Sequence, residues 1–148
     1  MFSKTIPLLL TLGLFAAVNT VASAQARALA PPSHVRSSAA YAELLLRQTE
    51  LTAGVESLLM EFTEDYPKVK DLRLELDLLK AEGDRLSGVK PADAPKLTLA
   101  LGKLILGKVG HATSLKRLLS QYQEGHPSVK KEKRMVEIYE AAIKEILG

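Results

Sequence analysis

The sequence has no cysteine and no tryptophan, and aromatic residues make up only 5% of its 148 residues. Without cysteine, the chain has neither a disulfide framework nor thiolate chemistry. Aromatic and β-branched residues are too few for a protein built of β-sheets. Leucine, alanine, glutamate and lysine dominate instead, and they are typical of helical and coiled-coil proteins. The composition therefore predicts an all-α fold of one domain's size.

The first residues have the pattern of a secretory signal peptide. Lys4 precedes an apolar run from residue 6 to 18, and Ala22-Ser23-Ala24 then offers small residues at a cleavage site. The run is shorter than the ~20 residues that span a bilayer, and an uncleaved anchor is the alternative. We expect residues 1–24 to be removed, which leaves a periplasmic or secreted chain with no transmembrane segment.

Two stretches of the chain align with each other at an offset of 60 residues. Residues 66–70 (YPKVK) match residues 126–130 (HPSVK), and a Leu-Leu pair followed by an aromatic residue precedes both. The match predicts a duplicated unit in which each copy is a helix, a proline break and a second helix.

Four segments have apolar residues at spacings of three and four, which gives each segment one apolar stripe like that of a coiled coil. The expected helices are Ala39–Asp65, Pro67–Leu86, Ala94–Glu124 and Pro127–Leu147. The expected stripe of the third helix consists of Leu97, Leu101, Leu104, Ala112, Leu115, Leu118 or Leu119, and Tyr122.

Proline divides each copy, because it removes a helical hydrogen bond and pushes the residue before it out of the helical region. Tyr66 and His126 are therefore expected to be non-helical, while Pro67 and Pro127 begin the next helix. Gly125 can take the left-handed conformation that ends a helix. A hairpin at each break is favoured over a kink in one long helix, since each stripe needs a partner.

The chain is thus expected to have five parts. They are a signal peptide (1–24), a flexible leader (25–38), a first helical hairpin (39–86), a linker (87–95) and a second helical hairpin (96–148). The leader and the linker contain proline and small residues, which are typical of irregular structure. The two tandem antiparallel hairpins are compatible with a four-helix bundle and with an elongated assembly.

Charge is unevenly distributed between the two hairpins. Residues 39–90 contain 11 acidic and 7 basic residues (net −4), and residues 91–148 contain 6 acidic and 10 basic residues (net +4). Opposite net charges on the two segments indicate that the segments face each other, within one chain or between chains. Ordinary solvated helix faces are the alternative, since exposed ion pairs contribute only ~0–1 kcal/mol each.

The two turn sequences, YPKVK and HPSVK, each after a Leu-Leu and aromatic helix end, resemble the "HPxV" turn of bacterial polysaccharide chain-length regulators. In that family the turn lies in long periplasmic helices. The resemblance implies a coiled-coil helical hairpin in the cell envelope, and it implies nothing about activity.

Residues 102–108 fit the phosphate-loop pattern G-x-x-x-x-G-K. Val109 stands where that loop needs serine or threonine, and helical periodicity, not a strand, precedes the segment. We therefore interpret Gly102, Gly107 and Gly110 as small helix positions that let another helix approach closely.

No set of residues predicts catalysis or a cofactor. His34, His111 and His126 are far apart and lack partners at metal-ligand spacing. The carboxylates of Glu61, Glu64 and Asp65 are expected on a solvated helix end, and no histidine stands in a triad-like relation to the serines Ser114 and Ser120. The sequence predicts no catalytic, cofactor or metal residues and a protein that is not an enzyme.

A basic cluster is the one candidate site. It consists of Lys116, Arg117, Lys130, Lys131, Lys133 and Arg134. Cations at a helix N-terminus oppose the helix dipole, which points to an anionic partner: the acidic first repeat, anionic lipid head groups or an acidic polymer. The alternative is a solvated helix face whose cations pair with Glu132 and Glu137. Nucleic acid is not expected, because no aromatic stacking platform interleaves the cluster.

Two functions follow from these patterns. The first is a non-enzymatic scaffold or interaction protein of the cell envelope that binds itself or a protein partner. The alternative is a periplasmic chaperone-like protein that binds unfolded or anionic clients.

Overall fold

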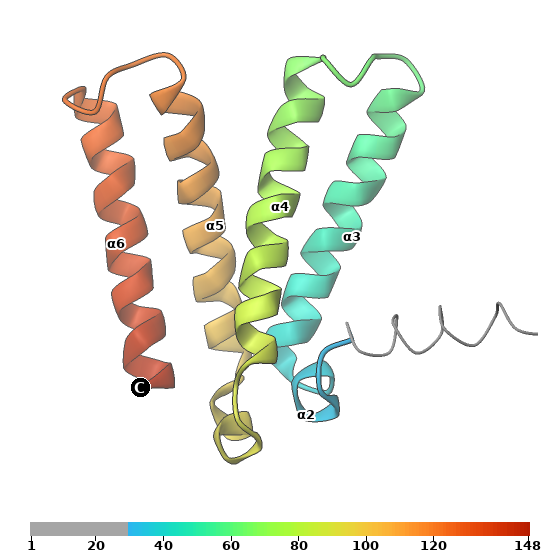
Figure 1. Cartoon of the computed structure of the whole chain (residues 1–148), viewed down its shortest axis with the longest axis vertical. Helices are drawn as coiled ribbons and strands as arrows, with labels where there is room; N and C mark the ends of the chain where they lie inside the picture. Colours follow the sequence, from blue (N-terminus) through green and yellow to red (C-terminus); the bar gives the residue numbers. More distant parts are fainter. Residues whose placement is uncertain (1–29) are drawn as a thin grey trace, which may run out of the picture. The chain divides into compact units, whose positions relative to one another are not determined.

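The computed structural model describes residues 30–148, and the expected signal peptide lies outside the described residues. All regular structure in this part of the chain is helical, which confirms the all-α prediction (Figure 1). The elements are α2 (Ser33–Arg36), α3 (Ala39–Leu59), α4 (Pro67–Ser87), the 3₁₀ helix η1 (Pro91–Lys96), α5 (Leu99–Leu119) and α6 (Pro127–Leu147).

The four long helices begin at two kinds of start signal. The side chains of Ser38 and Thr98 accept hydrogen bonds from backbone N–H groups in the first turns of α3 and α5, which satisfies donors that have no helical partner. The helices α4 and α6 instead begin with Pro67 and Pro127 in the first turn, where a missing N–H costs nothing. Tyr66 and His126, the residues before them, are extended.

Both turns are longer than expected. The helix α3 ends at Leu59, not at Asp65, and α5 spans Leu99–Leu119, not Ala94–Glu124. The loops 60–66 and 120–126 are hydrogen-bonded turns, in which Phe62 N–H donates to Leu58 O and Tyr122 N–H to Leu118 O, both at 2.8 Å. Nearly all side chains of these loops are exposed. A longer helix would therefore bury no additional side chains before the proline.

The prediction for Gly125 is wrong. Within residues 30–148, Gly148 is the one glycine with a positive φ, at 93°. The helix α5 already ends at Leu119, and the backbone of the following residue, Ser120, is right-handed. Gly125 therefore plays no part in capping that helix.

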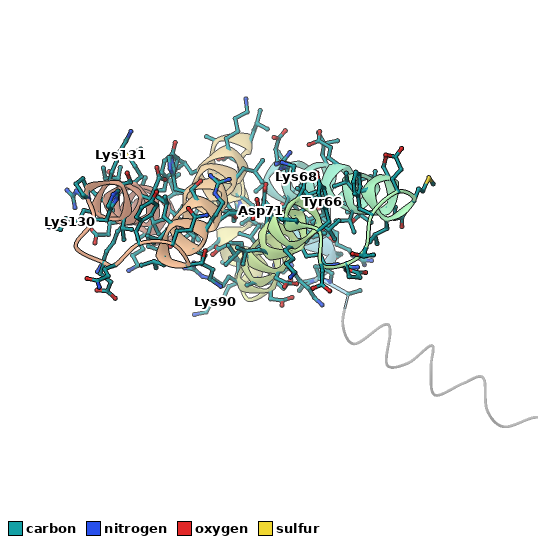
Figure 2. The ribbon with its side chains drawn as sticks, turned by 90° about the horizontal axis from the view of Figure 1, so that it is seen from above. Tyr66, Lys68, Asp71, Lys90, Lys130 and Lys131 are labelled. Carbon is teal, nitrogen blue, oxygen red and sulfur yellow. The ribbon has the colours of Figure 1, made fainter. Side chains whose placement is uncertain are left out.

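The helices pack as two antiparallel pairs, α3 with α4 and α5 with α6, and the pairs join into one bundle because α5 also packs on α3 and α4. This confirms hairpins over kinked long helices. Figure 1 shows both hairpin turns at one end of the bundle and η1 with α2 at the other. We call these the tip end and the linker end. The outermost helices of the row are α3 and α6 (Figures 1 and 2).

The hydrophobic core lies toward the linker end. Its buried members are Val35, Ala40, Leu44, Leu51, Leu79, Leu86, Leu97, Leu101, Ile105, Val109 and Ile143. The expected stripe of the third helix lacks Ile105 and Val109, which are 1% and 2% exposed. Because α5 packs against three helices, its buried arc is wider than the single stripe of a coiled coil.

The leader is not irregular throughout. Residues Ser33–Arg36 form α2, and Val35 is fully buried in the core. His34 Nε2 lies 2.8 Å from the backbone oxygen of Val89 in the linker. This part of the leader therefore packs on the bundle, in contrast to the expected flexible segment.

Candidate functional site

A cluster of four charged side chains joins the two hairpins inside the bundle. Lys108 of α5 lies with its Nζ 2.5 Å from Glu82 of α4 and 2.6 Å from Glu140 of α6. Arg85 of α4 donates to the same two carboxylates, at 3.0 Å to Glu140 and 3.1 Å to Glu82. Two cations and two anions thus meet with no net charge.

Burial makes this cluster more than a surface ion pair. Lys108 is only 7% exposed, and lysine is almost never buried unless it is paired. The hydrogen bond from Arg85, followed by that from Lys108, lowers the pKa of the Glu140 carboxyl from 4.5 to about 2. The charged form of Glu140 is therefore the form that the fold selects.

The segment that fits the phosphate-loop pattern lies inside α5 and forms no loop. A Cβ added at Gly102 would lie 3.0 Å from the Cα of Ala40 on α3, and one at Gly107 would lie 2.3 Å from the ring of Tyr139 on α6. These two glycines thus permit close packing, as expected. A Cβ at Gly110 would meet nothing within 4 Å, so the interpretation fails there.

The two turns are built alike. Phe62 stacks on Tyr66 with ring centroids 4.1 Å apart, and Tyr122 stacks on His126 at 4.2 Å. His126 Nδ1 also accepts a hydrogen bond from the N–H of Ser128, at 3.2 Å. The duplication of one ancestral unit remains a prediction, although the paired positions adopt the same arrangement.

The six residues of the predicted basic cluster all lie at the tip end. Lys116 and Arg117 are in the last turn of α5, and the other four follow Pro127 in the first turns of α6. Figure 2 looks down on this end and shows Lys130 and Lys131 on α6, on the far side of the bundle from Tyr66 and Lys68.

Two members of the basic cluster have acidic neighbours. Arg117 lies 3.9 Å from Asp71 of α4, and Arg134 lies 3.1 Å from Glu137 one turn further along α6. Within residues 30–148, no carboxylate lies at ion-pair distance from the other four, which are Lys116, Lys130, Lys131 and Lys133.

A pocket of about 470 Å³ lies between the end of α5 and the start of α6. Its lining residues are Leu115, Leu119, Glu124, Gly125, Val129, Lys130 and Lys133. Two of the predicted cations thus meet an apolar surface, and sequence reasoning missed this surface. The alignment of the two copies contains a signal for it, because Gly125 stands where the first copy has Asp65.

The histidines have separate neighbours. His111 Nδ1 lies 2.7 Å from Glu132 and its ring lies 5.3 Å from that of Tyr139. No group of three or more histidine, aspartate or glutamate side chains that could hold a metal ion occurs in residues 30–148. Glu64 and Asp65, expected on a solvated helix end, lie instead in the loop 60–66, where they pair with Arg73 and Lys70.

No protein-family model, curated protein or solved structure matches this chain. None of the described helices has the length and the apolar character needed to cross a membrane.

Proposed function

We propose that this chain is a non-enzymatic interaction protein of the cell envelope, and that it assembles with itself or with a protein partner through its two hairpin tips. We define the first tip as residues 56–74 and the second tip as the equivalent residues 116–134. The first tip has five acidic and three basic residues (net −2), and the second has two acidic and six basic residues (net +4). This opposite charge of equivalent surfaces is the observation that carries the proposal.

Exposed apolar side chains accompany the charges at both tips. Met60 is 86% and Phe62 40% exposed on the first tip, and Leu119 is 43% and Tyr122 44% exposed on the second. Contact surfaces typically combine apolar and aromatic side chains with a charged rim. The core lies toward the linker end, so the tips are available for contacts outside the bundle.

A non-enzymatic role is supported by the bonding within the charged cluster around the buried Lys108. Glu82, Arg85, Lys108 and Glu140 are bonded to one another, so the fold already uses these groups as structural partners. The envelope setting rests on the signal-peptide pattern in residues 1–24, which lie outside the described residues. It also rests on the resemblance of the turns to periplasmic hairpins.

The test is the mass of the purified protein by light scattering on a sizing column, at about 0.01 M and about 1 M salt. We expect an oligomer at low salt that dissociates at high salt, because the Debye length falls from about 30 Å to about 3 Å. The charge reversals K116E/K131E on the second tip are expected to dissociate it at low salt. The control K90E/K103E changes two exposed lysines away from the tips. A monomer under all conditions, or equal effects of both variants, would contradict self-assembly through the tips.

The exposed apolar side chains of the tips also support the second candidate, a chaperone-like protein that binds unfolded clients. That function predicts that a near-equal molar amount of the protein suppresses the aggregation of a reduced, unfolded client. The variant M60S, which removes the most exposed apolar side chain, is expected to weaken the suppression. The control T63S alters an exposed residue of the same loop. Aggregation that proceeds unchanged with the wild-type protein would exclude this role.

A further inference from the structure

The pocket of the second tip combines an apolar floor with two cations. Leu115 and Leu119 of α5 and Val129 of α6 form the floor, while Lys130 and Lys133 line it from α6. Glu124 is the one acidic residue in the lining, so the site carries a net charge of +1. A volume of about 470 Å³ lies within the range of roughly 300–1,000 Å³ that is common for small-molecule pockets.

The first hairpin shows how the same positions look when their charges are balanced. The counterparts of Lys130 and Lys133 are Lys70 and Arg73. Lys70 lies 2.9 Å from Asp65, and Arg73 is hydrogen-bonded to Glu64. Two carboxylates of the same hairpin therefore neutralise Lys70 and Arg73.

The second hairpin lacks one of these carboxylates. Glu124 corresponds to Glu64, but Gly125 stands at the position of Asp65. Compared with the first hairpin, the pocket therefore lacks the carboxylate that would pair with Lys130. In the first hairpin this carboxylate belongs to Asp65 and bonds to the ammonium of Lys70. The hydrogen bond with Lys70 lowers the pKa of Asp65.

The apolar floor is also more open in the second hairpin. Val55, the counterpart of Leu115, is 5% exposed, whereas Leu115 is half-buried. Leu119 is 43% exposed, whereas its counterpart Leu59 is half-buried. An apolar group placed on this floor would remove exposed hydrocarbon from water, which is favourable.

We propose that the pocket of the second tip binds an aliphatic monocarboxylate, a free fatty acid of medium chain length. Its carboxylate takes the place that Asp65 has in the first hairpin and accepts hydrogen bonds from Lys130, with Lys133 beside it. Its chain lies on Leu115, Leu119 and Val129. A single negative charge matches the net charge of the lining, and the apolar floor disfavours polar anions. This binding activity goes beyond the assembly proposed above.

The test is a titration of the full protein with monomeric octanoate, followed by calorimetry. Octanol and acetate are the matched probes, because one lacks the charge and the other lacks the chain. We expect saturable 1:1 binding of octanoate that is at least about tenfold tighter than that of either probe. Octanol offers no carboxylate for a charge-assisted hydrogen bond, and acetate has no chain to cover the apolar floor. Absence of saturable binding, or equal binding of octanol, would overturn the proposal.

A second arm uses the difference between the two hairpins. The substitution Gly125→Asp restores the carboxylate of the first hairpin, and a Cβ at residue 125 meets nothing within 4 Å. We expect G125D to lower the octanoate affinity at least about tenfold, while the isosteric G125N stays within about threefold of the wild type. Equal affinities of G125D and G125N would also overturn the proposal. Light scattering on the same samples reports assembly separately.

Discussion

The ammonium group of Lys108 donates a hydrogen bond of 2.6 Å to the carboxylate of Glu140, although the two residues lie on different helices and Lys108 is almost fully buried. The carboxylate of Glu82, which belongs to the other hairpin, lies 2.5 Å from the same ammonium group. One side chain thus bonds to both hairpins at the middle of the bundle.

Replacing Lys108 with methionine is expected to destabilise the protein by about 2 to 3 kcal/mol. Two carboxylates would be left facing each other with Arg85 as their one cation, and removing one partner of a buried ion pair is costly. Urea unfolding followed by circular dichroism measures the change. The control K103M alters an exposed lysine of the same helix and is expected to stay within about 0.5 kcal/mol of the wild type. Equal effects of the two variants would show that the cluster adds no stability.

Acid is expected to weaken the bundle through Glu140. Its folded pKa of about 2 lies below the ordinary value of 4.5, so its stabilising effect is complete above pH about 4.5. The effect is lost as the pH falls from there toward about 2. Over this window we expect on the order of 2 kcal/mol of unfolding free energy to disappear.

The variant E140Q checks this assignment, because it removes the titrating group. It is expected to be less stable at pH 7 and to lose less stability between pH about 4.5 and about 2 than the wild type. E145Q, at an exposed position of α6, serves as the control. If E140Q and the wild type show the same acid profile, Glu140 is not the group responsible.

Two glycines of α5 are expected to respond oppositely to alanine. At Gly102 a Cβ would lie 3.0 Å from the backbone of Ala40, so G102A forces α3 and α5 apart and costs about 1 to 3 kcal/mol. At Gly110 the space is open, and alanine raises helix propensity by about 1 kcal/mol. Thermal unfolding is expected to give a lower Tm for G102A and a higher Tm for G110A. Shifts of the same sign would contradict the packing of α3 on α5.

Val35 is expected to stabilise the whole bundle from outside the hairpins. It is fully buried in the common core, and V35A removes about 2 kcal/mol of apolar burial and packing. R36A, at the exposed neighbour, is expected to change stability by less than about 0.5 kcal/mol. Chemical unfolding of both variants makes the comparison, and a neutral V35A would mean that α2 is dispensable.

Local signals predicted the four helices and their order. Proline positions fixed the starts of α4 and α6, since the effect of proline on the preceding residue does not depend on the rest of the fold. The predicted ends of α3 and α5 lie six and five residues beyond the observed ends. The end of a helix in an exposed loop depends on tertiary burial, which the apolar periodicity of the sequence does not contain.

The interior of the bundle was harder to predict than its elements. Lys108 is charged, and a lysine on a helix normally faces solvent. Its burial depends on Glu82 and Glu140, which lie 26 and 32 residues away in the chain. Only the position of Lys108 between the apolar residues Ile105 and Val109 indicated the buried face. The sequence named the members of the basic cluster, but their division into paired and unpaired residues required three-dimensional neighbours.

The position of the core toward the linker end has a consequence for how the bundle opens. The buried residues Val55 and Val129 near the tips lie outside the core cluster, whereas Leu101 belongs to that cluster and lies on α5, the helix that packs against three others. We therefore expect exchange with deuterated water to be fastest at the tips and slowest in the first half of α5. On this expectation the hairpins open first at their turns, while the linker end of the bundle stays closed.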